Sequence, residues 1–231
     1  MNKYKAIILS LLISFMGASC EDWLYDNVNE DAAHEVLPQQ VLPVVLFYSA
    51  QLQFDHAEYG AYLTQTLTTG GRNQTSSFAY KSGWGDFLTM NRHPQWRRHF
   101  YDIGVNAKEI IDEAHEAQAW NLELIGRTLR LMSTQMTTDL FGDMPRSEAY
   151  ESNSPHYDTQ ESIYEWMNQE IEELIGMYED PTYTEAATNI PIDQSIDRVF
   201  AGDLNKWKHY TYALKARLLL RKLPNWENNA A

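Results

Sequence analysis

The chain has 231 residues, a formal net charge of −14, and 44% hydrophobic and 13% aromatic residues. This hydrophobic content is enough for a packed core and argues against disorder. The acidity argues against binding to nucleic acid and against direct electrostatic binding to an anionic membrane. The single cysteine, Cys20, excludes a disulfide or a cysteine-based zinc site within one chain.

The N-terminus has the pattern of a secretory signal peptide. Lys3 and Lys5 precede an apolar stretch over residues 6–16, which is too short to span a bilayer as a helix. Gly17, Ala18 and Ser19 then lead to Cys20, as in a bacterial lipobox, although leucine is commoner than glycine at the position of Gly17. We therefore predict a signal peptide over residues 1–19 and lipidation of Cys20. The alternative is a core helix that contains a cysteine.

The mature chain is predicted to have two parts. Residues 20–36 form a lipid-anchored tether, in which the acidic Glu21 and Asp22 follow the cysteine directly. Residues 37–231 form a helical domain that begins near Pro38. Pro43 lies within the first turns of its first helix, where the ring costs least. The apolar residues at helical spacing in this helix are Val41, Val44, Val45, Tyr48 and Leu52.

A second helical stretch is predicted from about residue 56 to residue 67, and Gly70-Gly71 ends it. Residues 70–95 are then predicted to form a long loop, because glycine, serine and asparagine are frequent there. Long ordered loops in compact domains are often functional.

The loop carries the candidate ligand-binding residues. A sugar-binding site needs aromatic faces that stack on C–H surfaces and planar polar groups that bond to hydroxyls. We predict that the aromatic and polar side chains of the loop supply both, and these are Trp84, Tyr80, Arg72, Asn73 and Gln74. The alternative is that the rings fill the domain's own core. That interpretation is favoured for Phe78 and Phe87, and it stays open for Trp84.

Two helices with clear apolar stripes follow the loop. The first stripe is Phe100, Ile103, Ala107, Ile110 and Ala114, and the second is Leu122, Ile125, Leu129, Met132, Met136 and Leu140. The short connection between them predicts an antiparallel hairpin. Trp96 is predicted to pack against this first helix. Gly142 is predicted to end the second helix as a left-handed cap.

A third strong helix is predicted after residue 158, where Asp158 and Glu161 resemble a capping box. Its stripe is Ile163, Met167, Ile171, Leu174 and Tyr178. Asp203 is expected to cap a last helix, whose core face is Trp207, Tyr210, Leu214 and Leu218. No strand series is evident. The predicted class is all-α, with tetratricopeptide-like helix pairs and long irregular loops.

Catalytic and metal-binding patterns are weak. Asp139 and Asp143 could act as the acid pair of a glycosidase, but their place at a helix end favours capping by Asp143 and surface pairing of Asp139. The histidines show no metal-ligand spacing, and no nucleotide-binding or serine-hydrolase motif occurs. The acidic loop over residues 179–185 lacks the EF-hand pattern. We therefore predict no cofactor and assign no metal.

Three segments together resemble one family. They are the lipobox start, the run RLMSTQMTTDLFGDMPRSEA over Arg130–Ala149, and the run DRVFAGDLNKWKHYTYALKARLLLR over Asp197–Arg221. In these features the chain is similar to the SusD/RagB family of Bacteroidetes outer-membrane nutrient-binding lipoproteins. Members of that family are usually much longer, so the chain looks like the N-terminal part of such a protein.

The resemblance implies a function and partners. It implies capture of a glycan or similar nutrient at the cell surface, without catalysis, for delivery to a TonB-dependent transporter of the SusC type. Starch, fructan, host glycans and peptides are all compatible ligands. The acidic pair after Cys20 resembles a signal for display on the outer face of the outer membrane. Two alternatives stay open: a surface-anchored glycoside hydrolase, and a helical-repeat scaffold that binds only protein.

Overall fold

The computed structural model describes residues 37–64, 66 and 94–222, and these residues form helices and irregular segments without a named strand. The longer helices are α3 (Pro38–Leu63), α6 (Asn106–Glu116), α7 (Trp120–Phe141), α8 (Gln160–Glu179) and α10 (Leu204–Lys222). Shorter elements are α5 (Pro94–Arg97), the π-helix η2 (Arg98–Val105) and α9 (Pro181–Thr184). The all-α prediction is confirmed for this part of the chain.

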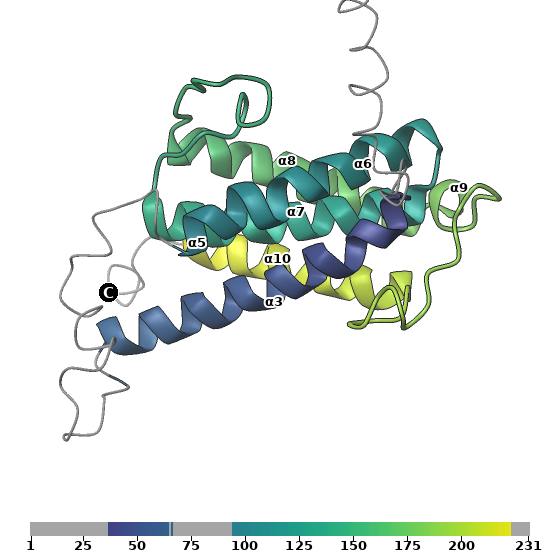
Figure 1. The fold of residues 1–231 in the computed structure, drawn as a ribbon, viewed down its shortest axis with the longest axis horizontal. Coiled ribbons are helices and arrows are strands. Elements are labelled where there is room, and N and C mark those ends of the chain that lie inside the picture. The colour runs from purple at the N-terminus through teal and green to yellow at the C-terminus, as the bar shows by residue number, and fades with distance from the viewer. Residues whose placement is uncertain (1–36, 65, 67–93, 223–231) are drawn as a thin grey trace, which may run out of the picture. The chain divides into compact units, whose positions relative to one another are not determined.

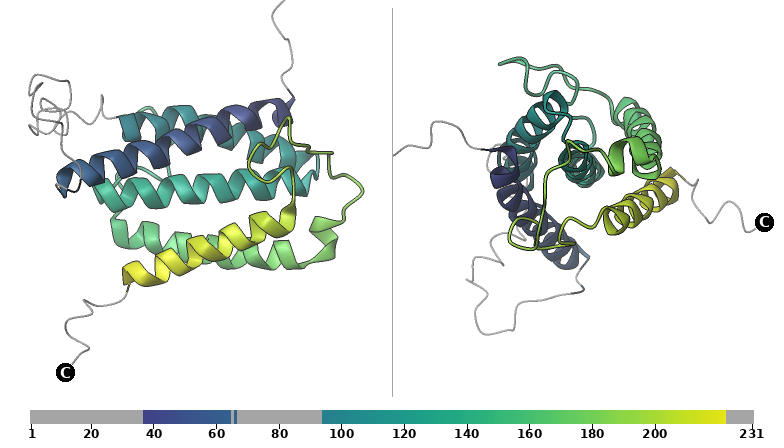
Figure 2. Two further views of the ribbon diagram at one scale, coloured as in Figure 1. Left: turned by 90° about the horizontal axis from the view of Figure 1, so that it is seen from below. Right: turned by 90° about the vertical axis from the view of Figure 1, so that its right-hand side faces the viewer.

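Helix α7 lies at the centre of the helical domain. It contacts α3, η2, α6, α8 and α10, which surround it in the end-on view of Figure 2. Residues 117–119 join α6 to α7, and the two helices lie side by side as the predicted hairpin (Figure 1). The predicted stripe from Leu122 to Met136 is buried among the core side chains.

Burial on all sides of α7 imposes a polar constraint. Every residue from Asn121 to Thr138 is buried except Arg130, which is half-buried. Polar groups in such a helix need internal partners, because water does not reach them. The hydroxyls of Thr128 and Thr137 meet this need locally, since each donates to the carbonyl four residues earlier at 2.8 Å.

The first helix differs from the prediction in its length. α3 runs unbroken from Pro38 to Leu63, although we expected a boundary between residues 52 and 56. No glycine or proline interrupts that stretch. Asp55 instead accepts a hydrogen bond from Arg98 Nε at 2.5 Å, which joins the helix interior to η2. Pro43 lies within the helix, as predicted.

The helix predicted over residues 100–114 contains a π-helical segment. η2 covers Arg98–Val105 and continues into α6. Its Gly104 lies against Tyr150, because a Cβ built at Gly104 would be 1.8 Å from the Tyr150 hydroxyl oxygen. Glycine at this position therefore allows the loop tyrosine to pack directly on the η2 backbone.

Two helix ends differ in detail from the predicted caps. Gly142 has φ +75° and ψ −124°, so its φ is positive as expected but it is not in the left-handed helical conformation. α8 is capped by Thr159, whose hydroxyl accepts from Ser162 N, and not by the Asp158 capping box. Asp158 is used elsewhere, because its carboxylate accepts from the backbone N–H groups of Arg146 and Ser147 at 2.8 and 2.9 Å.

The start of α10 is organised by a buried carboxylate. Asp197 is fully buried, and one of its oxygens accepts from Trp207 Nε1 at 2.8 Å and from Gly202 N at 2.9 Å. Asp203 caps the helix as predicted, with its carboxylate accepting from Asn205 N at 3.0 Å. Gly202 has φ +74°, and a Cβ there would lie 2.2 Å from the Ile192 carbonyl oxygen.

Within residues 37–64, 66 and 94–222, no helix combines the length and the apolar character that crossing a membrane requires.

Among the described residues, Gly142 and Gly202 are the two glycines with positive φ, and they give a matched test of the turn before α10. A Cβ at position 142 meets open space, so we expect Gly142→Ala to lower the free energy of unfolding only through backbone strain, by about 1–3 kcal/mol. Gly202→Ala adds a clash with backbone, and we expect its free energy of unfolding to fall by about 1–3 kcal/mol more. Urea denaturation of both variants measures the difference. Equal losses would mean that the segment around Ile192 moves aside at little cost.

Candidate functional site

The candidate ligand residues of the loop and the candidate lipidation site, Cys20, lie outside the described residues. Arg72, Asn73, Gln74, Tyr80 and Trp84 therefore stay predictions. The structure does describe where the chain enters and leaves that segment. It leaves from the end of α3 and returns at Pro94, and α5 packs against α3.

The aromatic residue nearest to the loop has a packing role. Trp96 is half-buried, and its ring centroid lies 4.7 Å from that of Phe100 and 5.2 Å from that of Phe141. The prediction that Trp96 packs in the helical layer is confirmed. The indole holds α5 against the C-terminal end of α7, so the chain returns from the loop onto a fixed support.

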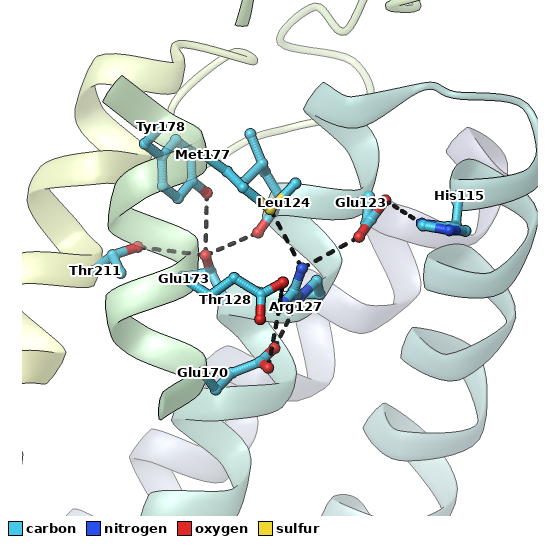
Figure 3. A network of polar contacts seen from close by, with 10 residues as sticks. All are labelled: His115, Glu123, Leu124, Arg127, Thr128, Glu170, Glu173, Met177, Tyr178 and Thr211. Carbon is cyan, nitrogen blue, oxygen red and sulfur yellow. Dashed lines mark hydrogen bonds and ion pairs between the residues drawn. The ribbon is translucent and has the colours of Figure 1, made fainter. Parts of the chain in front are cut away.

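The largest polar network of the described residues centres on Arg127 of α7 (Figure 3). Its guanidinium donates to both oxygens of Glu170 on α8, at 2.8 and 3.0 Å, in a bidentate pair. It also donates to Glu123 at 3.3 Å and lies 2.9 Å from Glu173. The side chains of Arg127, Glu123 and Glu170 are only 9%, 5% and 9% exposed, so these charges lie in a largely dry environment.

Burial alone would lower the pKa of Arg127, but hydrogen bonds and charge attraction from Glu170 outweigh it, and its pKa is raised. The guanidinium therefore stays charged. Beside it, Thr128 Oγ1 lies 3.0 Å from the Tyr178 hydroxyl and 3.3 Å from Thr211 Oγ1, which ties α7 to α8 and α10 (Figure 3). Burial raises the pKa of Tyr178, so this phenol is neutral.

This network joins helices and has no arrangement suited to catalysis. Glu123 and Glu170 share the guanidinium of Arg127 as their ion-pair partner. A glycosidase needs one carboxylic acid with a raised pKa beside a second carboxylate, both facing a substrate. The network therefore serves the packing of α7 against α8.

Asp139 and Asp143 are also engaged in the fold. Asp143 accepts from Gln160 N at 2.8 Å and so supports the start of α8. Asp139 accepts from the Tyr164 hydroxyl and lies 3.3 Å from Arg221 Nε. The side chain of Asp139 is only 7% exposed, whereas that of Arg221 is 57% exposed. Asp139 is therefore paired, but the prediction that it lies at the surface is wrong. The two aspartates hold α7, α8 and α10 together.

A polar cavity of about 200 Å³ lies between α6, α7, α8 and the segment over residues 145–151. We call it the Arg130 cavity. Its charged lining residues are Lys108, Asp112, Arg130, Arg146 and Glu151, and His99, Thr134, Pro145, Ser147, Ala149, Tyr150 and Trp166 complete it.

Two arginines of the cavity share one aromatic ring. The guanidinium carbon of Arg146 lies 4.7 Å from the ring centroid of Trp166, and that of Arg130 lies 6.0 Å from it. Both distances are within the range of a cation–π contact. Asp158 fixes the backbone of Arg146, as described above. Burial alone would raise the pKa of Asp158, but these backbone hydrogen bonds outweigh it and its pKa is lowered.

Two further titratable groups of the cavity, His99 and Tyr150, are neutral, and the pKa of Arg130 is shifted. Burial, with repulsion from Arg130, lowers the pKa of His99 to about 3, and its Nδ1 lies 2.7 Å from Ser133 Oγ. Burial raises the pKa of Tyr150 to about 12. Burial and the nearby charge of Arg127 lower the pKa of Arg130, although Glu170 partly offsets them.

The sequence contained one unused signal for this cavity. Arg127 and Arg130 lie three residues apart on a helix whose other residues are mostly apolar or small, and buried arginines need partners. The pattern did not indicate that one arginine would be paired with carboxylates and the other with an indole. No group of three or more histidine, cysteine, aspartate or glutamate side chains suited to a metal ion occurs among the described residues.

The Arg127 network can be tested by its removal. We expect Arg127→Met to lower the free energy of unfolding by about 3–5 kcal/mol, because Glu123 and Glu170 stay buried without their cation. Adding Glu123→Gln and Glu170→Gln should restore part of the loss. Arg198→Met, at an exposed arginine, is the control. A loss below about 1 kcal/mol in denaturant titrations would contradict this account.

His99 should make stability depend on pH. Its folded pKa is below the usual value of 6.5, so the unfolded state binds the proton first as pH falls. Stability should therefore drop below about pH 6.5, by up to about 1.4 kcal/mol per pH unit from this residue. We expect His99→Gln to have a correspondingly shallower pH dependence between about pH 6 and 5 in urea titrations. Parallel curves of stability against pH for His99→Gln and the wild type would refute this prediction.

Comparison with known proteins agrees with the fold and the sequence motifs. A SusD-like family described as starch-binding and associating with the outer membrane matches residues 46–228. The crystal structure of a SusD/RagB family protein from Bacteroides thetaiotaomicron aligns with a TM-score of 0.58 and 21% sequence identity. The alignment covers 81% of this chain and 38% of that chain, so the chain spans well under half the length of its structural relative. No protein of curated function matches the sequence.

The family match covers most of the helical domain, including α7, the segment after it, and α10. The structural match independently supports the same helical fold. The chain therefore belongs to the SusD/RagB family.

Proposed function

We propose that the chain is the N-terminal part of a lipid-anchored protein that binds a glycan at the outer cell surface without cleaving it. In this proposal Cys20 carries the lipid and residues 20–36 are the tether. A SusC-type TonB-dependent transporter receives the ligand. The observation that supports it most directly is the match of residues 46–228 to a family described as starch-binding and associating with the outer membrane.

The described helices support a binding role for the loop that connects α3 to α5. Arg98 of η2 bonds to Asp55 of α3, and Trp96 packs on Phe100 and Phe141. These contacts fix the place where the chain returns from the loop. A loop closed on a rigid base can present side chains with less loss of conformational entropy on binding than one with free ends.

The described carboxylates favour binding over hydrolysis. Glu123 and Glu170 are neutralised by Arg127, Asp143 supports α8, and Asp139 is held by Tyr164 and Arg221. Each therefore has a structural task. A hydrolase would require a separate acid pair that converges on the sugar.

Trp84→Ala tests the proposed site. We expect it to weaken the binding of maltooligosaccharides about tenfold or more, because the stacking face for the sugar is lost. Isothermal titration calorimetry on the mature protein measures the affinity, and a reducing-sugar assay on the same samples measures cleavage.

Tyr101→Ala is the control, because Tyr101 is an aromatic residue outside the loop with 73% of its surface exposed. It should bind like the wild type. Equal affinities of the Trp84 variant and the wild type would reject Trp84 as the stacking residue. Release of reducing sugar by the wild type would favour the hydrolase alternative.

A further inference from the structure

The charges of the Arg130 cavity are unevenly matched. Lys108, Arg130 and Arg146 bring three positive charges, whereas Asp112 and Glu151 bring two negative ones. Both carboxylates are engaged by Lys108, at 2.6 and 3.4 Å. The lining is therefore net positive, although the chain as a whole has a formal charge of −14.

Among the described residues, neither arginine of the cavity has an acidic partner at ion-pair distance. Arg130 and Arg146 each contact the Trp166 ring, and neither forms an ion pair within 4.0 Å in the described part of the chain. Arg127, one turn earlier on α7, has three carboxylates around it. An indole face attracts a guanidinium but does not cancel its charge.

The cavity has room for a ligand. Its volume of about 200 Å³ corresponds to about six or seven water molecules at about 30 Å³ each, which is enough for a single sugar ring. Ser147 and Glu151 at its rim are exposed, so the cavity opens to solvent. The Trp166 indole offers an apolar face beside the guanidinium groups.

We propose that the Arg130 cavity binds a compact oxyanion, and that the carboxylate of a sugar acid is the occupant that its size and lining suit best. The planar donors of an arginine match the two oxygens of a carboxylate, and the charge-assisted bonds are strong in a partly buried site. A free inorganic anion such as sulfate has the same recognition chemistry. The residues of this site belong to η2, α6, α7, α8 and the segment over 145–151, so the proposal is independent of the proposed glycan-binding loop.

The test measures binding of three probes to the mature protein by isothermal titration calorimetry: glucuronate, glucose and sulfate. We expect glucuronate to bind and glucose not to bind. Arg130→Gln should weaken glucuronate about tenfold or more, because a charge-assisted hydrogen bond is lost. Arg130→Lys keeps the charge but lacks the planar fork, so its affinity should lie between those of the wild type and Arg130→Gln.

Arg198→Gln is the matched control, because it removes the same charge from an exposed position. It should change the affinity less than about twofold. Circular dichroism and thermal unfolding should show that each variant folds, because Arg130→Gln removes a partly buried charge that has no ion-pair partner within 4.0 Å among the residues that the structure describes. Sulfate binding with the same dependence on Arg130 would support the oxyanion site and assign it to a free anion. Absence of glucuronate and sulfate binding, binding unaffected by Arg130→Gln, or equal binding of glucose would overturn the proposal.

Discussion

The described fold depends on the buried guanidinium of Arg127. Helix α7 is covered by other helices along nearly its whole length, and the side chain of Arg127 is only 9% exposed, so its charge is largely removed from water. Glu170 of α8 supplies a bidentate partner and Glu123 supplies a second one from α7 itself. This arrangement fixes the rotation and the axial position of α8 against α7, since a shift of either helix would leave a buried charge without its partner.

A comparison of Arg127 with Arg130 shows how one helix supports two different tasks. Both side chains leave α7, one turn apart. The first meets a carboxylate from α8, and the second meets an indole from the same helix. Arg127 therefore forms a closed ion pair with a glutamate, whereas Arg130 contacts a tryptophan and lines a polar cavity. Burial, with the nearby charge of Arg127, lowers the pKa of Arg130.

Much of the helical arrangement could be predicted from apolar periodicity. The stripe from Ile163 to Tyr178 is buried as expected, and so are Trp207, Leu214 and Leu218. Periodicity did not reveal the π-helix η2 or the packing of Tyr150, from a distant segment, against its Gly104. The predicted capping box at Asp158 was also wrong, because contacts with another segment occupy its carboxylate.

The Asp158 carboxylate instead accepts hydrogen bonds from the backbone N–H groups of Arg146 and Ser147. The neighbouring Thr159 caps α8 in its place. The Arg130 cavity was missed because its residues come from five separate segments, and their meeting depends on tertiary packing. The predicted ligand residues of the loop, by contrast, rest on residue type and spacing alone.

The two motifs that carry the family resemblance consist mainly of residues with tasks in the fold. In the run from Asp139 to Pro145, Asp139 and Asp143 bind neighbouring helices, Gly142 turns the chain, and Met144 is fully buried and pairs by its backbone with Asp158.

In the second motif, Asp197 binds Gly202 and Trp207 at the start of α10. These residues determine how the helices are joined, and so they identify the fold well and the ligand poorly. Ligand specificity must then come from side chains other than these fold-determining residues. This is why the predicted loop between α3 and α5, and the Arg130 cavity, to which Arg130 and Arg146 of the first motif contribute, are the places where experiments on binding have the most to decide.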